Sequence, residues 1–98
     1  MTYTLSIRKE AEADIAEAYQ YYEECQTGLG ADLMLCIDES ITKIRRNPKQ
    51  FRAIRNKIRR SFVRRFPYGI YYLLNDKEIV VLAVARARRN PVHWQSRS

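Results

Sequence analysis

The chain has 98 residues, of which 46% are hydrophobic and 11% aromatic, and it carries a formal net charge of +7. This composition excludes a disordered chain, and the length fits a single domain spanning residues 1–98. The sequence contains no apolar run of transmembrane length and no apolar leader segment, so we expect a cytoplasmic protein without membrane attachment.

The charge is distributed unevenly along the chain. Residues 1–40 carry two basic and nine acidic side chains, a net charge of −7, whereas residues 41–98 carry sixteen basic and two acidic side chains, a net charge of +14. This asymmetry predicts an anionic partner, either nucleic acid or an acidic protein, for the second part of the chain. The alternative is that the basic side chains only keep a small protein soluble.

The first half of the chain predicts one strand followed by two helices. Apolar and polar residues alternate over residues 3–7, which is typical of a half-buried strand. From Glu10 onwards the apolar residues recur at helical spacing, with acidic residues on the other faces. Residues 26–30 predict a turn, and a second amphipathic helix then continues to Asn47 and Pro48. Two helices joined this closely are expected to form a hairpin.

The second half predicts strands. Residues 51–54 form either a short strand or an irregular segment, and three further strands are expected at residues 58–66, 68–74 and 79–85. Short turns between these three strands favour an antiparallel meander. The expected fold is therefore α+β with the order β-α-α-β-β-β, in which a helical hairpin packs on one face of a small antiparallel sheet. The tail from Arg86 to Ser98 is expected to be a loop or a short turn.

Arginines mark the candidate binding surface. Val80, Leu82 and Val84 are predicted to share a strand face with Arg86, so the basic residues begin where the apolar stripe ends. We expect the arginines of residues 58–66 to reach the same rim or the uncovered sheet face, which would make one basic patch from two strands. The candidate partner-binding residues are Arg59, Arg60, Arg64, Arg65, Arg86, Arg88, Arg89 and Trp94.

The residue types limit the possible chemistry. No set of cysteines, histidines and carboxylates has the spacing of a metal site, and no glycine-rich phosphate loop is present, so no metal or cofactor is expected. Arginines could stabilise the phosphorane in metal-independent RNA cleavage, for which the catalytic candidates are Arg60, Arg88 and His93. We interpret Tyr68, Tyr71 and Tyr72 as strand core rather than as proton carriers. Whether the protein is an enzyme stays open at this point.

Several segments together resemble the RelE/ParE superfamily of bacterial toxins. These segments are A-x-x-D-I-x-x-A-Y-x-Y-Y from Ala11, L-G-x-D-L from Leu29, I-R-R-N-P at the end of the second helix, F-P-Y-G-I-Y-Y-L-L, E-I-V-V-L-A-V-A and R-A-R-R-N-P-V-H-W. The resemblance covers nearly the whole chain. It implies a β-α-α-β-β-β toxin of a type II toxin–antitoxin module, and a hetero-oligomer with a small antitoxin whose acidic, partly disordered end wraps the toxin.

The resemblance implies one of two activities. RelE-like members cut mRNA in the ribosome with basic residues and a C-terminal acid or base, whereas ParE-like members poison DNA gyrase. Arg88, and Arg59 or Arg60, match basic positions of the RelE-like set. However, Gly69 stands where RelE-like enzymes carry an arginine, no tyrosine follows Tyr72, and Arg86 stands where many relatives carry histidine. These departures favour a ParE-like gyrase inhibitor over a RelE-like ribonuclease. A third possibility is an inactive homologue or a basic binding module.

Overall fold

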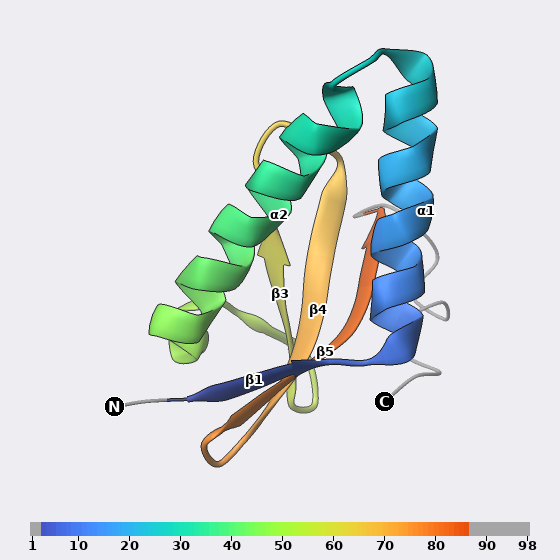
Figure 1. Cartoon of the computed structure of the whole chain (residues 1–98). Helices are drawn as coiled ribbons and strands as arrows, with labels where there is room; N and C mark the ends of the chain where they lie inside the picture. Colours follow the sequence, from blue (N-terminus) through green and yellow to red (C-terminus); the bar gives the residue numbers. More distant parts are fainter. Residues whose placement is uncertain (1–2, 87–98) are drawn as a thin grey trace.

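The computed structural model describes residues 3–86, and in these residues two helices cover one face of a five-stranded sheet (Figure 1). The elements in chain order are β1 (Thr4–Ile7), α1 (Lys9–Cys25), α2 (Leu29–Arg46), a short 3₁₀ helix η1 (Pro48–Gln50), β2 (Ala53–Arg55), β3 (Ile58–Phe62), β4 (Tyr68–Asn75) and β5 (Glu78–Arg86). The predicted α+β class and the helical hairpin on a small sheet are confirmed. No helix of the described residues is long and apolar enough to cross a membrane.

The sheet has the strand order β1-β5-β4-β3-β2. Strands β2 to β5 form an antiparallel meander, as the short turns predict. Strand β1 departs from the expectation because it pairs in parallel with β5, so the sheet is mixed. The reason is topological, since the meander leaves one side of β5 open and β1 occupies it. The segment that the sequence left undecided, residues 51–54, overlaps the three-residue strand β2, which lies at the opposite edge of the sheet.

A carboxylate of α1 fixes the helical hairpin. The two side-chain oxygens of Glu23 accept hydrogen bonds from the backbone N–H groups of Gly28, at 2.9 Å, and Gly30, at 3.0 Å. The first N–H groups of a helix have no partner within the helix, and a carboxylate there also interacts favourably with the helix dipole. This capping explains why α2 begins at Leu29, inside the segment that the sequence predicts as a turn.

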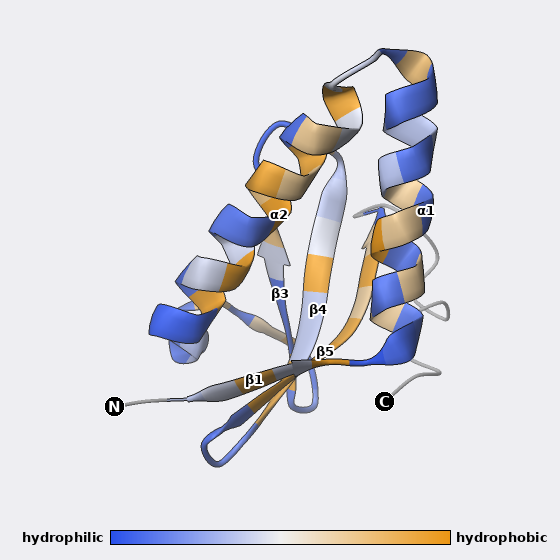
Figure 2. Cartoon of the chain, in the orientation of Figure 1, coloured by the Kyte–Doolittle hydropathy of each residue, from blue (hydrophilic) through white to orange (hydrophobic). Residues whose placement is uncertain are grey.

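The main core lies between the helices and the sheet. Leu33, Ile37 and Ile44 of α2 are almost completely buried and pack in one cluster with Ile70 and Tyr72 of β4. Figure 2 shows the hydrophobic residues in orange along α2 and β5. The opposite face of the sheet carries a second, smaller cluster, whose buried members are Ile58, Tyr71, Leu82, Ala83 and Ala85. The assignment of Tyr68, Tyr71 and Tyr72 to the core is therefore confirmed.

A β-bulge in β5 corrects the predicted face of that strand. The register passes from Tyr71 opposite Ala83 to Tyr72 opposite Val81, so Leu82 is the extra residue. As a result Val84 packs in the helix-facing cluster, whereas Val80 and Leu82 belong to the cluster on the opposite face. The prediction that Val80, Leu82 and Val84 share one face is wrong, because one inserted residue shifts the alternation of the strand.

The bulged strand is held from the helical layer. The backbone N–H of Val84 donates a hydrogen bond of 3.0 Å to Oδ2 of Asp14 in α1. A backbone N–H in a partly buried position needs such an acceptor, because leaving it unpaired costs free energy. Asp14 thus ties α1 to β5 next to the irregular part of the strand.

Buried Tyr72 predicts a specific alkaline instability. Its hydroxyl donates a hydrogen bond of 2.6 Å to the carbonyl oxygen of Pro48, and burial raises its pKa from 10.0 to about 12. Below pH 10 the hydroxyl is neutral in both states, so its contribution to stability is fully present. Between about pH 10 and 12 only the unfolded chain ionises, so we expect about 2 kcal/mol of the free energy of unfolding to be lost.

The test is chemical denaturation of the wild type and Tyr72→Phe across this pH range. The variant should lose about 1 kcal/mol at pH 7, because the Pro48 carbonyl loses its donor, and its stability should depend less on pH above 10. An equally steep alkaline loss in both proteins would show that other groups dominate the titration.

Candidate functional site

The loop between β3 and β4 holds one arginine pair against α2. Nε of Arg64 lies 2.9 Å from Oε1 of Glu39, and this hydrogen bond lowers the pKa of the Glu39 carboxyl. Nη2 of Arg65 lies 3.7 Å from Oδ2 of Asp32, and the Arg65 guanidinium is 5.5 Å from the ring centroid of Phe66. Both ion pairs are on the surface. The pair therefore has acidic partners on the helical layer instead of pointing toward the opposite face of the sheet.

The other arginine pair is split between the two faces of β3. Arg59 lies opposite Tyr72, a residue of the helix-facing cluster, whereas Arg60 lies opposite Tyr71 of the second cluster. Nη1 of Arg59 donates hydrogen bonds to the carbonyl oxygens of Phe51, at 2.7 Å, and Lys49, at 3.4 Å. Arg59 therefore has a structural task, since it holds the segment between α2 and β3 against the sheet.

Arg60 has a different environment on the opposite face. Its guanidinium lies 4.4 Å from the ring centroid of Phe62, a distance typical of a cation–π contact. Phe62 is 59% exposed, which is unusual for a large aromatic side chain on a strand of a small protein. Hence an arginine and a phenylalanine are presented together beside the second cluster.

Arg86 lies at the end of β5 beside α1. Its guanidinium is 6.0 Å from the ring centroid of Tyr21 and 5.8 Å from that of Tyr68. A pocket of about 200 Å³ opens next to it and is also lined by Asp14 and Glu17. The position of Arg86 at the strand end agrees with the predicted rim, but it faces α1 and not Arg60.

The candidate arginines within residues 3–86 do not form the predicted single basic patch. The structure distributes the described candidate arginines over the helix-facing side of β3, the opposite side of β3, the loop next to α2 and the end of β5. The alternation of side chains along a strand separates Arg59 from Arg60, and acidic residues of α2 hold Arg64 and Arg65. The remaining predicted site residues, Arg88, Arg89, His93 and Trp94, lie outside the described residues.

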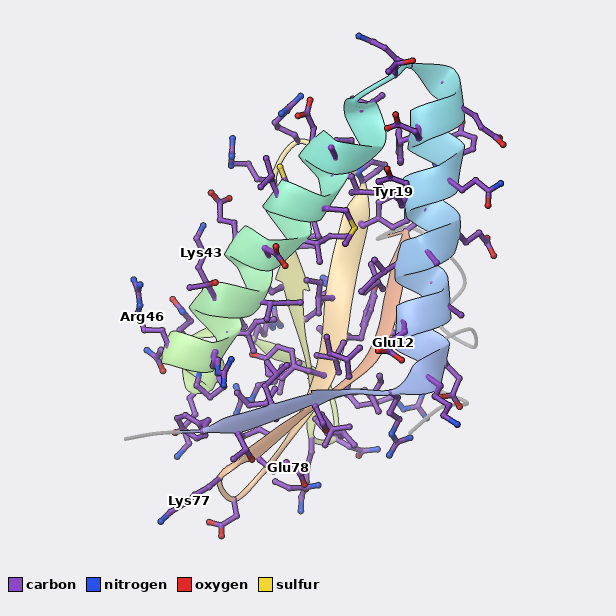
Figure 3. The ribbon with its side chains drawn as sticks, viewed as in Figure 1. Glu12, Tyr19, Lys43, Arg46, Lys77 and Glu78 are labelled. Carbon is purple, nitrogen blue, oxygen red and sulfur yellow. The ribbon has the colours of Figure 1, made fainter. Side chains whose placement is uncertain are left out.

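Another basic group lies at the end of α2. Lys43, Arg45 and Arg46 occupy its last turn, where positive charge interacts favourably with the helix dipole. Figure 3 shows Lys43 and Arg46 projecting outward from α2, away from the sheet. These positions suit a helix terminus, and they lie apart from the sheet face that carries Arg60.

Within residues 3–86 the candidate acid–base groups are carboxylates and tyrosines. These residues include no histidine, and no group of three or more potential metal ligands gathers among them. Burial raises the pKa of Tyr72 to about 12 and also raises the pKa of Tyr22, so both hydroxyls stay neutral at pH 7. Cys36 is buried and Cys25 exposed, both as free thiols. Around Arg60 the described surface offers a cation and an aromatic ring to a partner, whereas the carboxylates of Asp14 and Glu17 lie at the pocket next to Arg86.

Sequence reasoning missed Phe62. In the sequence it stands in a run of arginines and apolar residues that reads as a strand, where an aromatic residue is normally core. A strictly alternating pattern would have placed Phe62 on the same face as Ile58 and Arg60, but it could not have shown that this end of the strand is exposed.

The fold is similar to that found in two solved toxin–antitoxin systems. The chain is similar to the structure of a chromosomal ParDE toxin–antitoxin system from P. aeruginosa, with a TM-score of 0.77, 19% identity, and coverage of 87% of this chain and 96% of that chain. It is also similar to the toxin–antitoxin complex RelBE2 from Mycobacterium tuberculosis, with a TM-score of 0.60, 17% identity, and coverage of 88% and 99%. At these identities the likeness concerns the fold.

The sequence comparison assigns the family. Residues 5–91 match the model of the ParE toxin of the type II toxin–antitoxin system parDE. Toxin ParE2 of Mycobacterium tuberculosis is 29% identical over 92 residues, which cover 93% of this chain and 88% of the relative. The chain belongs to the ParE toxin family of type II toxin–antitoxin systems, so the predicted membership of the RelE/ParE superfamily is confirmed.

Proposed function

We propose that this protein is a toxin that inhibits DNA gyrase by direct protein contact. The observation that carries this proposal is the composition of the sheet face around Arg60. Arg60 and the exposed ring of Phe62 offer a docking surface there. The tyrosines of the described strands are core residues, and no histidine lies among residues 3–86. Such a surface suits binding better than RNA cleavage, which requires a base and an acid.

We further propose that a cognate antitoxin neutralises this protein in a hetero-oligomer in the cytoplasm. Support comes from the similar structures, which are toxin–antitoxin systems from P. aeruginosa and Mycobacterium tuberculosis. The charge pattern agrees, because the net charge of +14 on residues 41–98 would attract an acidic, partly disordered partner. RelE-like cleavage of ribosome-bound mRNA is the competing activity, and His93, its candidate proton carrier, lies outside residues 3–86.

A gyrase assay tests the proposed activity. Purified protein is titrated into DNA gyrase acting on relaxed plasmid, and supercoiled and cleaved plasmid are quantified. We expect supercoiling to fall, and gyrase-dependent cleaved DNA to accumulate, as the protein is added. Unchanged supercoiling at a large molar excess of the protein, together with cleavage of mRNA on added ribosomes, would overturn the proposal in favour of a ribonuclease.

The pair Arg64 and Arg65 provides a separate prediction. Changing both to alanine should reduce toxicity or antitoxin affinity, because it removes two cations from the surface. The melting temperature should change little, since both side chains are more than half exposed and exposed ion pairs contribute little to stability. Growth arrest, antitoxin affinity and thermal unfolding are the measurements. An unfolded double variant would show instead that the ion pairs to Glu39 and Asp32 hold the loop structure together.

A further inference from the structure

Arg60 and Phe62 form a preorganised unit on the sheet face opposite the helices. They are two positions apart on β3, so they project from the same face of the strand. The guanidinium of Arg60 lies 4.4 Å from the centroid of the Phe62 ring. The carbonyl oxygen of Phe62 also accepts a hydrogen bond of 3.3 Å from the Ser40 hydroxyl, which fixes the end of β3 against α2. We call these two side chains the Arg60–Phe62 platform.

Gly69 supports the platform from the neighbouring strand. It lies directly opposite Phe62 in the pairing of β3 with β4. A Cβ atom at this position would lie 3.1 Å from both Cγ and Cδ of Arg60, closer than ordinary van der Waals contact. The aliphatic part of Arg60 therefore rests on bare backbone, and the absence of a side chain at Gly69 allows the guanidinium to reach the Phe62 ring.

The charge of Arg60 is not balanced within residues 3–86. Arg64 and Arg65 have carboxylates from α2, and Arg59 donates to two backbone carbonyls. Arg60 is half-buried, yet among the described residues its only specific contact is the cation–π contact with Phe62. A partly desolvated guanidinium without a carboxylate is a favourable site for one supplied by a partner, because two parallel hydrogen bonds can form.

We propose that the Arg60–Phe62 platform is the contact centre for the protein's target, and that the target presents a carboxylate beside an apolar side chain. Arginine and aromatic residues are enriched among the side chains that dominate binding energy at protein interfaces. The carboxylate binds the guanidinium, while the apolar side chain covers the exposed ring of Phe62. This inference rests on the proposed function, in which the target is a protein.

A protein target fits the platform better than a nucleic acid. Binding to a phosphate backbone relies on several cations acting together, and nearby Arg59, Arg64 and Arg65 are already engaged by groups of this chain. One side of the Phe62 ring faces Arg60, so the ring offers less surface for base stacking. A single cation beside a single aromatic ring therefore suits a protein partner better than a phosphate backbone.

Matched variants test this inference in the gyrase supercoiling assay. Phe62→Ala, Arg60→Gln and Gly69→Ala are each compared with the wild type. Leu35→Ala is the control for Phe62→Ala, since Leu35 is 68% exposed on α2. Arg46→Gln is the control for Arg60→Gln, since Arg46 is also exposed on α2. We expect each platform variant to need at least about tenfold more protein for half-inhibition, and the two controls to match the wild type. Thermal unfolding should show that the Phe62 and Arg60 variants remain folded.

The outcomes separate this inference from the proposed function. If the wild type inhibits gyrase and folded Phe62→Ala and Arg60→Gln inhibit it equally well, the platform is not the contact centre, although the proposed function stands. If the wild type does not inhibit gyrase, the proposed function fails and this inference fails with it. Loss of mRNA cleavage in the platform variants, without any wild-type effect on gyrase, would assign the surface to RNA and overturn the protein target.

Discussion

Replacing Leu33 with alanine is expected to lower the free energy of unfolding by about 2–5 kcal/mol, the range found when a fully buried leucine is truncated. Leu33 has no exposed surface and lies in the cluster between α2 and the sheet. The variant loses the transfer free energy of the removed methyl groups, and the cavity left behind collapses only partly. Urea denaturation followed by circular dichroism measures the difference directly.

Leu35 provides the matched control on the same helix. It is the same residue type two positions further along α2, but 68% of it is exposed. Leu35→Ala should therefore change the free energy of unfolding by no more than about 0.5 kcal/mol. Comparable losses in the two variants would mean that α2 does not pack on the sheet with the face described above.

Gly30→Val is expected to have the second large effect, a loss of about 3 kcal/mol, near the upper end of overpacking costs. A Cβ atom at Gly30 would lie 2.8 Å from the carbonyl oxygen of Tyr19 and 2.9 Å from Oε1 of Glu23. Figure 3 shows Tyr19 between the two helices. Because the nearest atom belongs to the backbone of α1, the helices would have to separate, and the cap that Glu23 forms on α2 would be disturbed.

Ala31→Val is the control for this substitution. Ala31 is exposed at the next position of α2, so the variant introduces the same β-branched side chain without a contact to α1. It should cost only a few tenths of a kcal/mol through lower helix propensity. If the two valine variants unfold at the same urea concentration, the close approach of the helices at Gly30 does not exist in solution.

The periodic segments of the sequence predict most of the fold. Helical spacing places α1 and α2 correctly, and the short turns predict the meander of β3 to β5, because these features depend on neighbouring residues. The parallel pairing of β1 with β5 and the bulge at Leu82 were not predictable in the same way. Both depend on contacts between segments far apart in the chain, such as the hydrogen bond from Val84 to Asp14.

The candidate site was harder to predict than the fold. The arginines were identified as a group, yet the partners that separate them come from distant elements: Glu39 lies 25 residues before Arg64. The opposite directions of Arg59 and Arg60 follow from strand alternation alone. The exposure of Phe62 depends on which parts of the sheet face are covered, a property that one sequence does not contain.

The most direct test of the gyrase account is to induce the protein in growing bacteria without its antitoxin, and to map DNA breaks and new mRNA 5′ ends in the same culture. We predict growth arrest with gyrase-dependent DNA breaks and intact transcripts. Transcripts cut in a ribosome-dependent manner, with the DNA intact, would contradict the account and identify the protein as an mRNA endonuclease.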